Sequence, residues 1–196
     1  MNLLEQKILE YGTVLPGDIL KVDNFLNHQV DTETMYWIGE EFYRRFSGHK
    51  ITKVLTIESS GIAPAVMAAY FFQVPFVFAK KARSANLGTA GLYTAKVVSY
   101  TYGNEYTITC SEKYLGSEDH VLIIDDFLAT GEASRGLLEL CHKAGATVEG
   151  IGICIEKGFQ NGGRELREKG YHLESLAIID EMKDDGTLKF RGSENG

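Results

Sequence analysis

Short apolar runs that alternate with helical patterns constrain the fold of this chain most. Each run is too short for an ordinary helix and is rich in aliphatic or aromatic residues, as in strands buried on both faces. Segments of helical period follow most of these runs. The order predicts an α/β protein with a five-stranded parallel sheet flanked by helices on both faces. The predicted strands are Lys53–Ile57, Val74–Ala79, Val121–Asp125, Val148–Glu156 and His172–Ile179.

Five segments carry helix signals. Leu3–Tyr11 has apolar residues at helical spacing and stops at Gly12. Asp31 is expected to cap a helix that runs to about Phe46. The remaining helices are predicted at Ile62–Phe71, at Glu132–Ala144 and at Gly163–Lys169, the last two ending at glycine.

The segments between these elements predict an insertion and short extended pieces. Val14–Asn27 mixes turn residues with short apolar–polar alternations, which indicates short extended pieces. Arg83–Gly91 is small and polar, and we expect a mobile loop there. Two β-rich runs, Leu92–Tyr102 and Glu105–Cys110, flank Gly103-Asn104, which predicts a hairpin inserted between the second and third parallel strands.

The end of the sequence offers one more extended segment. Thr187–Phe190 reads TLKF and is expected to add an edge strand. No internal repeat or linker interrupts the chain. A length of 196 residues then indicates a single domain over residues 1–196.

Charge and composition exclude several function classes. The net charge is −7 and the pI is about 5.3, which argues against binding to nucleic acid or to an anionic membrane through overall charge. The sequence has no apolar run that would span a bilayer, and its first residues, MNLLEQKILEYG, lack the basic start of a signal peptide. We therefore expect a cytoplasmic protein. The three cysteines are expected to be buried and reduced, and the histidines show no zinc-ligand spacing.

Two adjacent aspartates end the third predicted strand, and a small flexible turn follows. The stretch Val121–Ser134 reads VLIIDDFLATGEAS. Acids after strands often form turns or helix caps, so the pair alone identifies no site. The turn Ala129–Ala133 opens a helix, however, and amides at the start of a helix bind phosphate. Because carboxylates accept hydrogen bonds from vicinal hydroxyls, the pattern indicates a phosphate beside a cis-diol, as in ribose 5-phosphate.

Other phosphate and nucleophile motifs are missing. The Walker pattern G-x-x-x-x-G-K-[ST] does not occur, which argues against a P-loop NTPase. No G-x-G-x-x-G opens a helix after the first parallel strand, and no G-x-S-x-G elbow occurs. These absences disfavour a dinucleotide-binding domain and a serine hydrolase.

The stretch VLIIDDFLATGEAS resembles the signature for phosphoribosyl pyrophosphate (PRPP) in the type I phosphoribosyltransferases. Four further stretches resemble the members of this family that act on xanthine, and the similarity covers nearly the whole chain. They are VLPGDILKVDNFLNHQVD, TIESSGIAPAVMAA, VPFVFAKK and GIGICIEKGFQ. The resemblance implies the type I phosphoribosyltransferase fold, in which roughly the first 30 residues contribute to a small hood over the purine site.

The resemblance also implies how PRPP is bound. Asp125 and Asp126 would be the catalytic residues, and their carboxylates would bind the ribose hydroxyls. The turn residues would hold the 5′-phosphate; they are Ala129, Thr130, Gly131, Glu132 and Ala133. The loop after the first parallel strand would grip the pyrophosphate through its amides; it consists of Glu58, Ser59, Ser60 and Gly61.

Further positions follow from the same resemblance. Lys80 or Lys81 would reach the pyrophosphate, in relatives often from the neighbouring subunit, although without the resemblance a solvated strand end is the better explanation of these lysines. The purine pocket would comprise Leu20, Asn27 and Lys157, with a turn role as the alternative for the asparagine. One position departs from the family, because many relatives have threonine where this chain has Ala133. Replacement of that hydroxyl by the neighbouring Ser134 is left open by the sequence.

The activity implied is transfer of the 5-phosphoribosyl group from PRPP to xanthine, which gives xanthosine 5′-monophosphate and pyrophosphate. Mg²⁺ would be carried by PRPP, without direct side-chain ligands. A homodimer is implied as well. Guanine or hypoxanthine remain as alternative substrates, because a pocket that reads ring carbonyls accepts related oxopurines. A PRPP-sensing regulator is the other alternative, but such proteins need a basic DNA-binding element and this chain is acidic.

Overall fold

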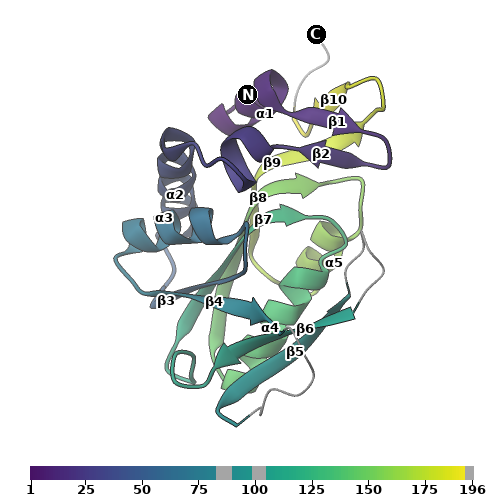
Figure 1. Cartoon of the computed structure of the whole chain (residues 1–196). Helices are drawn as coiled ribbons and strands as arrows, with labels where there is room; N and C mark the ends of the chain where they lie inside the picture. The colour runs from purple at the N-terminus through teal and green to yellow at the C-terminus, as the bar shows by residue number, and fades with distance from the viewer. Residues whose placement is uncertain (83–89, 99–104, 193–196) are drawn as a thin grey trace.

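A mixed sheet of eight strands forms the centre of the protein, and helices cover both of its faces (Figure 1). The structure, a computed structural model, describes residues 1–82, 90–98 and 105–192. The strand order is β10-β9-β8-β7-β3-β4-β6-β5. The strands are β3 (Lys53–Ile57), β4 (Phe76–Lys81), β5 (Leu92–Val98), β6 (Glu105–Ser111), β7 (His120–Leu128), β8 (Thr147–Lys157), β9 (Leu173–Met182) and β10 (Leu188–Phe190).

The predicted parallel core is confirmed. Strands β4, β3, β7, β8 and β9 are neighbours and pair in parallel. Antiparallel strands extend the sheet at both edges, with β10 beside β9 and the β5–β6 hairpin beside β4. The edge strand and the inserted hairpin were both expected. The predicted turn at Gly103-Asn104 and residues 83–89 of the predicted loop lie outside the described residues.

The helices begin and end close to the predicted positions. They are α1 (Leu3–Tyr11), α2 (Thr32–Phe46), α3 (Ile62–Phe72), α4 (Glu132–Ala144) and α5 (Gly162–Glu168). Asp31 caps α2 as expected, because its carboxylate accepts the Thr34 N–H at 3.3 Å. Gly145 ends α4 with a φ of 71°, a left-handed conformation that glycine adopts without steric cost.

Four predicted elements differ most from the structure. Strands β7 and β9 each run three residues past their predicted ends, so Asp125 and Asp126 lie inside β7 and not at its end. Strand β4 starts two residues later than expected and continues to Lys81, because Lys80 and Lys81 pair with the inserted hairpin. The N-terminal segment forms a small sheet of β1 (Thr13–Leu15) and β2 (Ile19–Lys21), as expected, but Asp23–Asn27 is a π-helix and not extended. Its helical turn buries the adjacent Phe25 and Leu26 together, whereas a strand would place them on opposite faces.

Two hydrophobic clusters lie on the two faces of the sheet. Helices α1, α2 and α3 cover one face, where Leu122 and Ile124 of β7 are buried. Helices α4 and α5 and the β5–β6 hairpin cover the other face, where Val121 and Ile123 of β7 are buried. This alternation along β7 explains why the strand reads as a continuous apolar run. The three cysteines are buried and free, as predicted. None of the described helices is long and apolar enough to cross a membrane.

Candidate functional site

The carboxyl ends of three parallel strands meet at one edge of the sheet. Strand β3 leads into the loop Glu58–Gly61, β4 ends at Lys81, and β7 carries Asp125 and Asp126. The Lys81 N–H donates to Glu58 Oε1 at 2.6 Å, which ties the loop after β3 to the end of β4. The Glu58–Ser59 peptide bond is cis. The structure thus places the sequence-predicted pyrophosphate loop and the predicted lysine side by side.

The two aspartates differ in exposure. Asp125 is buried, with 4% of its surface exposed, whereas Asp126 is half-buried and its N–H donates to Asp125 Oδ1 at 3.0 Å. Burial and the neighbouring Asp126 charge raise the pKa of Asp125 well above its ordinary value, against a smaller opposing effect of Lys81. A carboxyl that is buried beside a second acid favours the neutral form, and such perturbed groups gather at functional sites.

Gly61 allows the loop after β3 to lie directly over this pair. A Cβ atom at that position would be 3.0 Å from Asp125 Oδ1 and 2.2 Å from Thr56 Oγ1. Any larger residue would push the loop away from β7. The small residues predicted for this loop are therefore explained by its close approach to the acidic pair.

The turn between β7 and α4 lines a cavity of about 180 Å³. Gly131, with a φ of 86°, precedes α4 and supplies no side-chain cap, so the first amides of the helix stay free for a ligand. Tyr106 of β6 also lines this cavity. Burial and, to a smaller extent, the Asp125 charge raise the pKa of Tyr106. Phe127 and Leu128, which follow Asp126 on β7, line the cavity as well, so it begins beside the acidic pair. Residues Ala129–Ser134 form the rest of this side.

Two residues that sequence reasoning missed contact this turn from behind. Arg135 Nη2 donates to the carbonyl of Thr130 at 2.8 Å, and the Gly162 N–H donates to the carbonyl of Ala129 at 3.1 Å. The Glu132–Arg135 pair has the i,i+3 spacing of a helical ion pair, which could have drawn attention to the arginine. No local pattern marks Gly162, because it reaches the turn only through the tertiary fold.

Ser134, beside the departure at Ala133, lines the same cavity. Its Oγ is buried and has no hydrogen-bond partner within the described part of the chain. The turn Ala129–Ala133 itself offers its backbone amides and the Thr130 hydroxyl as donors.

The predicted purine residues lie on the N-terminal side of the same edge. Lys157 ends β8, and its Nζ donates to the carbonyl of Asp18 in the β1–β2 turn at 2.7 Å. Burial lowers the pKa of Lys157. Leu20 is buried on β2, with 7% exposed, and Asn27 is exposed at the end of the π-helix. A hydrogen bond thus links Lys157 to the turn of the small N-terminal sheet. Asn27 ends the π-helix that follows this sheet in the chain.

The donor set limits how a metal ion would be held. Among the described residues no group of three or more His, Cys, Asp and Glu side chains is placed to hold a metal ion. At this site, Asp125 and Asp126 offer two carboxylates that are adjacent in the chain. Mg²⁺ is commonly bound by one or two carboxylates together with substrate phosphates, so the site fits a magnesium ion that enters with a phosphorylated ligand.

Comparisons with known proteins agree with this geometry. A model of the phosphoribosyl transferase domain matches residues 28–183. The xanthine phosphoribosyltransferase of Bifidobacterium adolescentis is 54% identical over 97% of this chain and 100% of its own length. That of Lachnoclostridium phytofermentans is 54% identical over 98% and 99%.

Solved structures show the same fold. The adenine phosphoribosyltransferase of Giardia lamblia in complex with 9-deazaadenine superposes with a TM-score of 0.75 and 25% identity, over 91% of this chain and 98% of that one. The enzyme from Rhodothermus marinus gives 0.72 and 25%, over 89% and 97%. With the acidic pair and the phosphate-suited turn at the sheet edge, these matches show that the chain belongs to the phosphoribosyltransferase family.

Proposed function

We propose that this protein transfers the 5-phosphoribosyl group from PRPP to xanthine, releasing xanthosine 5′-monophosphate and pyrophosphate. The observation that carries the proposal is the 54% identity to xanthine phosphoribosyltransferases over 97% of the chain. The reaction salvages a free purine as a nucleotide. The acidic pair, the turn before α4 and the loop after β3 are three adjacent sites suited to the three parts of PRPP.

The roles of the PRPP residues follow from their chemistry. The amides of Ala129–Ala133 hold the 5′-phosphate at the start of α4. Asp126, the more exposed acid, accepts hydrogen bonds from the ribose hydroxyls, and Asp125 supports it from the buried side. The Glu58–Gly61 amides bind pyrophosphate, together with Lys81 at the end of β4.

The reaction breaks the bond between the anomeric carbon and pyrophosphate, so positive charge develops on the ribose ring. The two aspartates lie where a carboxylate would stabilise this charge. Holding PRPP and purine in reacting positions supplies up to about 7–11 kcal/mol of the barrier in ideal cases. Mg²⁺ bound with PRPP would neutralise charge on the leaving pyrophosphate. PRPP would carry that ion without direct side-chain ligands, and the loop amides would bind the phosphates.

The purine is proposed to bind between β2, the π-helix and the end of β8. Leu20 supplies an apolar surface. Asn27 both donates and accepts hydrogen bonds and is therefore suited to a ring carbonyl beside an N–H. Lys157 offers a donor to a second carbonyl, and it links this pocket to the β1–β2 turn, which we propose as part of the hood.

Initial rates with PRPP, Mg²⁺ and one purine at a time test the proposal. Xanthine is expected to give nucleotide with a higher kcat/KM than guanine, hypoxanthine or adenine. The Asn27→Ala variant should raise the KM for xanthine and leave the KM for PRPP unchanged, with Asn24→Ala as a neighbouring control. A preference for another purine would overturn the substrate assignment, and equal changes in both KM values would remove Asn27 from the pocket.

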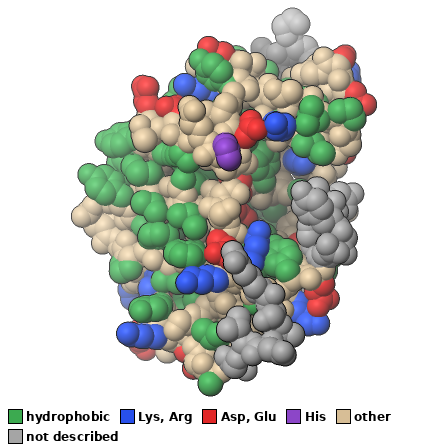
Figure 2. Space-filling view, viewed as in Figure 1, with side chains coloured by type: hydrophobic (Ala, Val, Ile, Leu, Met, Phe, Trp, Pro, Cys, Tyr) green, Lys and Arg blue, Asp and Glu red, His purple; other side chains and the backbone are tan. Residues whose placement is uncertain are grey.

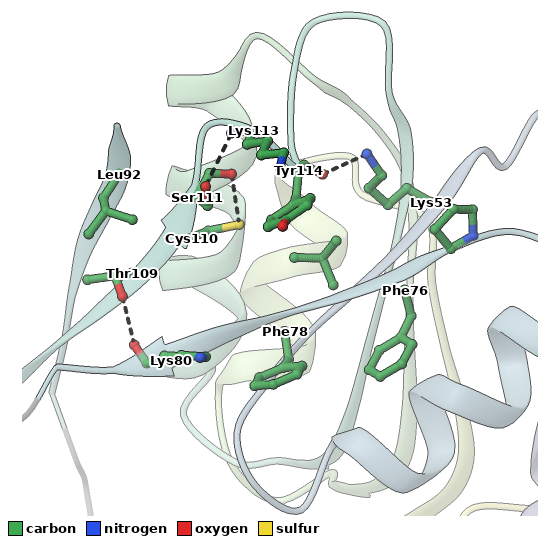
Figure 3. Close-up of a pocket in the computed structure, with 12 residues that line it drawn as sticks. Lys53, Phe76, Phe78, Lys80, Leu92, Thr109, Cys110, Ser111, Lys113 and Tyr114 are labelled. Atoms are coloured by element: carbon green, nitrogen blue, oxygen red, sulfur yellow. Dashed lines mark hydrogen bonds between the residues drawn. The ribbon is translucent and has the colours of Figure 1, made fainter. Parts of the chain in front are cut away.

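We further propose a cytoplasmic homodimer. Tyr36 and Tyr70, on α2 and α3, are 51% and 61% exposed, and Figure 2 shows hydrophobic side chains gathered over these two helices. A cavity of about 580 Å³ lies against β4, with Phe76 and Phe78 of β4 on one wall and Tyr114 opposite (Figure 3). A second copy of the chain seated here would bury the aromatic surface.

Lys80 lines the same cavity, at the end of the strand that also carries Lys81. The interface would therefore border the pyrophosphate loop. Sedimentation of the wild type and of Tyr70→Glu tests the proposal. We expect a dimer for the wild type and a monomer for the variant. A wild-type monomer at the concentrations used in the assay would refute it.

A further inference from the structure

Two main-chain carbonyls behind the turn between β7 and α4 are held by residues from two different helices. Arg135 of α4 donates from Nη2 to the carbonyl of Thr130 at 2.8 Å. Gly162, the first residue of α5, donates its N–H to the carbonyl of Ala129 at 3.1 Å. Both carbonyls belong to the segment that lines the cavity before α4.

Peptide geometry converts these contacts into an orientation of the amides. In a planar trans peptide the C=O and the following N–H point in opposite directions. The only cis bond among the described residues is Glu58–Ser59, so both peptides of the turn are trans. When the Ala129 carbonyl is held toward Gly162 and the Thr130 carbonyl toward Arg135, the amides of Thr130 and Gly131 must face the other way.

The approach of α5 leaves no room for a side chain at residue 162. A Cβ atom on Gly162 would lie 2.5 Å from the Ala129 oxygen, 2.6 Å from the Gly131 nitrogen and 2.7 Å from the Thr130 carbonyl carbon. All three are backbone atoms of the turn, so they would have to move. A methyl group at this position would therefore displace the turn that lines the cavity.

Two acids keep Arg135 in place. Its guanidinium donates to the carboxylate of Glu132, and Nη1 donates to Glu165 Oε2 of α5 at 3.2 Å. The arginine thus links the starts of α4 and α5 as well as the turn. Its charge is balanced by these carboxylates, so its main contribution is to orient the turn and not to attract the phosphate.

We propose that Arg135 and Gly162 are positioning residues for the 5′-phosphate, which hold the turn from behind so that the Thr130 and Gly131 amides face the ligand. The inference rests on the proposed function, because it takes the ligand of this cavity to be the 5′-phosphate of PRPP. Neither residue touches the substrate. Their effect should therefore appear in the binding of phosphorylated ligands and not in the binding of the purine.

Steady-state kinetics of Gly162→Ala and Arg135→Met test the proposal. Loss of a charge-assisted or a backbone hydrogen bond that orients the donors should raise the KM for PRPP about tenfold, with the KM for xanthine unchanged. Arg135→Lys should recover part of the loss, because its ammonium keeps a donor for the Thr130 carbonyl. Gly162→Ala retains every side chain of the protein, so any change in the KM for PRPP must come from displacement of the backbone, and a thermal melt shows whether the fold as a whole is also weakened.

Matched controls are available on α2 and after it. Arg44→Met removes an arginine that pairs with a glutamate at the same i,i+3 spacing, far from the site in sequence. Gly48→Ala adds a methyl group in open space. Thermal melting of each variant measures folding separately. If Gly162→Ala and Arg135→Met match these controls in the KM for PRPP, or if both raise the KM for xanthine equally, the inference is wrong.

Calorimetric binding of ribose 5-phosphate separates this inference from the proposed function. Wild-type protein should bind it, and both variants should bind it about tenfold more weakly. A wild type that binds ribose 5-phosphate but forms no nucleotide from PRPP and any purine would refute the proposed function alone. Equal binding by the wild type and both variants would refute the positioning role alone.

Discussion

Replacing Asp126 by asparagine should lower activity while leaving the protein at least as stable. Asp126 is half-buried beside Asp125, which is buried and whose pKa is raised by burial and by the Asp126 charge. Asparagine has nearly the same shape but no charge, and its amide oxygen accepts weaker hydrogen bonds than a carboxylate does. The substitution therefore removes both the proposed ribose contact and a source of repulsion within the fold.

The two effects have opposite signs. A hydrogen bond to a charged group contributes about 1.5–3 kcal/mol, so its loss should reduce kcat/KM for PRPP roughly 10- to 150-fold. A carboxyl whose pKa is raised in the folded state favours folding below its unfolded pKa and loses that contribution as the pH rises through the folded value. Removing the Asp126 charge moves the pKa of Asp125 downward. As the pH rises from 4 to 8, the free energy of unfolding should therefore fall less for the variant than for the wild type. This window starts at the unfolded pKa of about 3.9.

Initial rates and urea unfolding at pH 5 and pH 8 measure both effects on the same preparations. Asp184→Asn, at an exposed position in the turn between β9 and β10, is a matched control and should change neither. A kcat/KM within about threefold of the wild type would refute the role of Asp126 in ribose binding. Activity and stability that fall together would refute the repulsion argument, because the loss would then reflect unfolding.

Three further predictions concern buried polar groups. Ser134→Ala should stabilise the protein by about 1 kcal/mol in urea unfolding and leave the KM for PRPP unchanged, because its buried hydroxyl has no partner within the described residues. Arg167→Met should cost about 3 kcal/mol of stability, since it leaves the buried Glu156 carboxylate without its bidentate partner. Glu149→Gln should cost about 1 kcal/mol of stability at pH 6 and progressively less as the pH falls below 4, because the hydrogen bond from His120 lowers the pKa of Glu149 and that stabilisation disappears as the carboxylate protonates.

Local signals in the sequence were sufficient to predict most of the fold. The bounds of α1 and α4 match the structure because glycine or a capping side chain marks their ends. Strand β4 and the π-helix at Asp23–Asn27 differ because their limits depend on tertiary contacts. Pairing with β6 extends β4 to Lys81, and burial of Phe25 and Leu26 winds the N-terminal segment into a helical turn. Neither contact leaves a pattern in the local sequence.

The parts of the candidate site that are adjacent in the sequence could be predicted from motifs. The contacts that only the tertiary structure brings together could not. The acidic pair and the turn before α4 adjoin in sequence, so their shared place at the sheet edge follows from one strand. The contact of Gly162 with that turn joins segments about 30 residues apart, and it exists only because β8 and α5 return to the same edge. Arg135 lies close to the motif, but its bond to the Thr130 carbonyl depends on a side-chain orientation that spacing does not define.

Two buried acidic residues, Glu156 and Asp125, differ in whether the protein itself satisfies their carboxylates. Glu156 is 2% exposed, and it accepts two hydrogen bonds from Arg167 at 2.8 Å each and one from Ser175 at 2.5 Å. These bonds outweigh the effect of burial and lower its pKa, so the carboxylate is satisfied within the protein. Asp125 is nearly as buried, yet its pKa is raised, and its carboxylate lies beside a second acid and below a glycine. Such a group is expected where a ligand completes its surroundings, so the contrast supports the candidate site at Asp125 and Asp126 of β7.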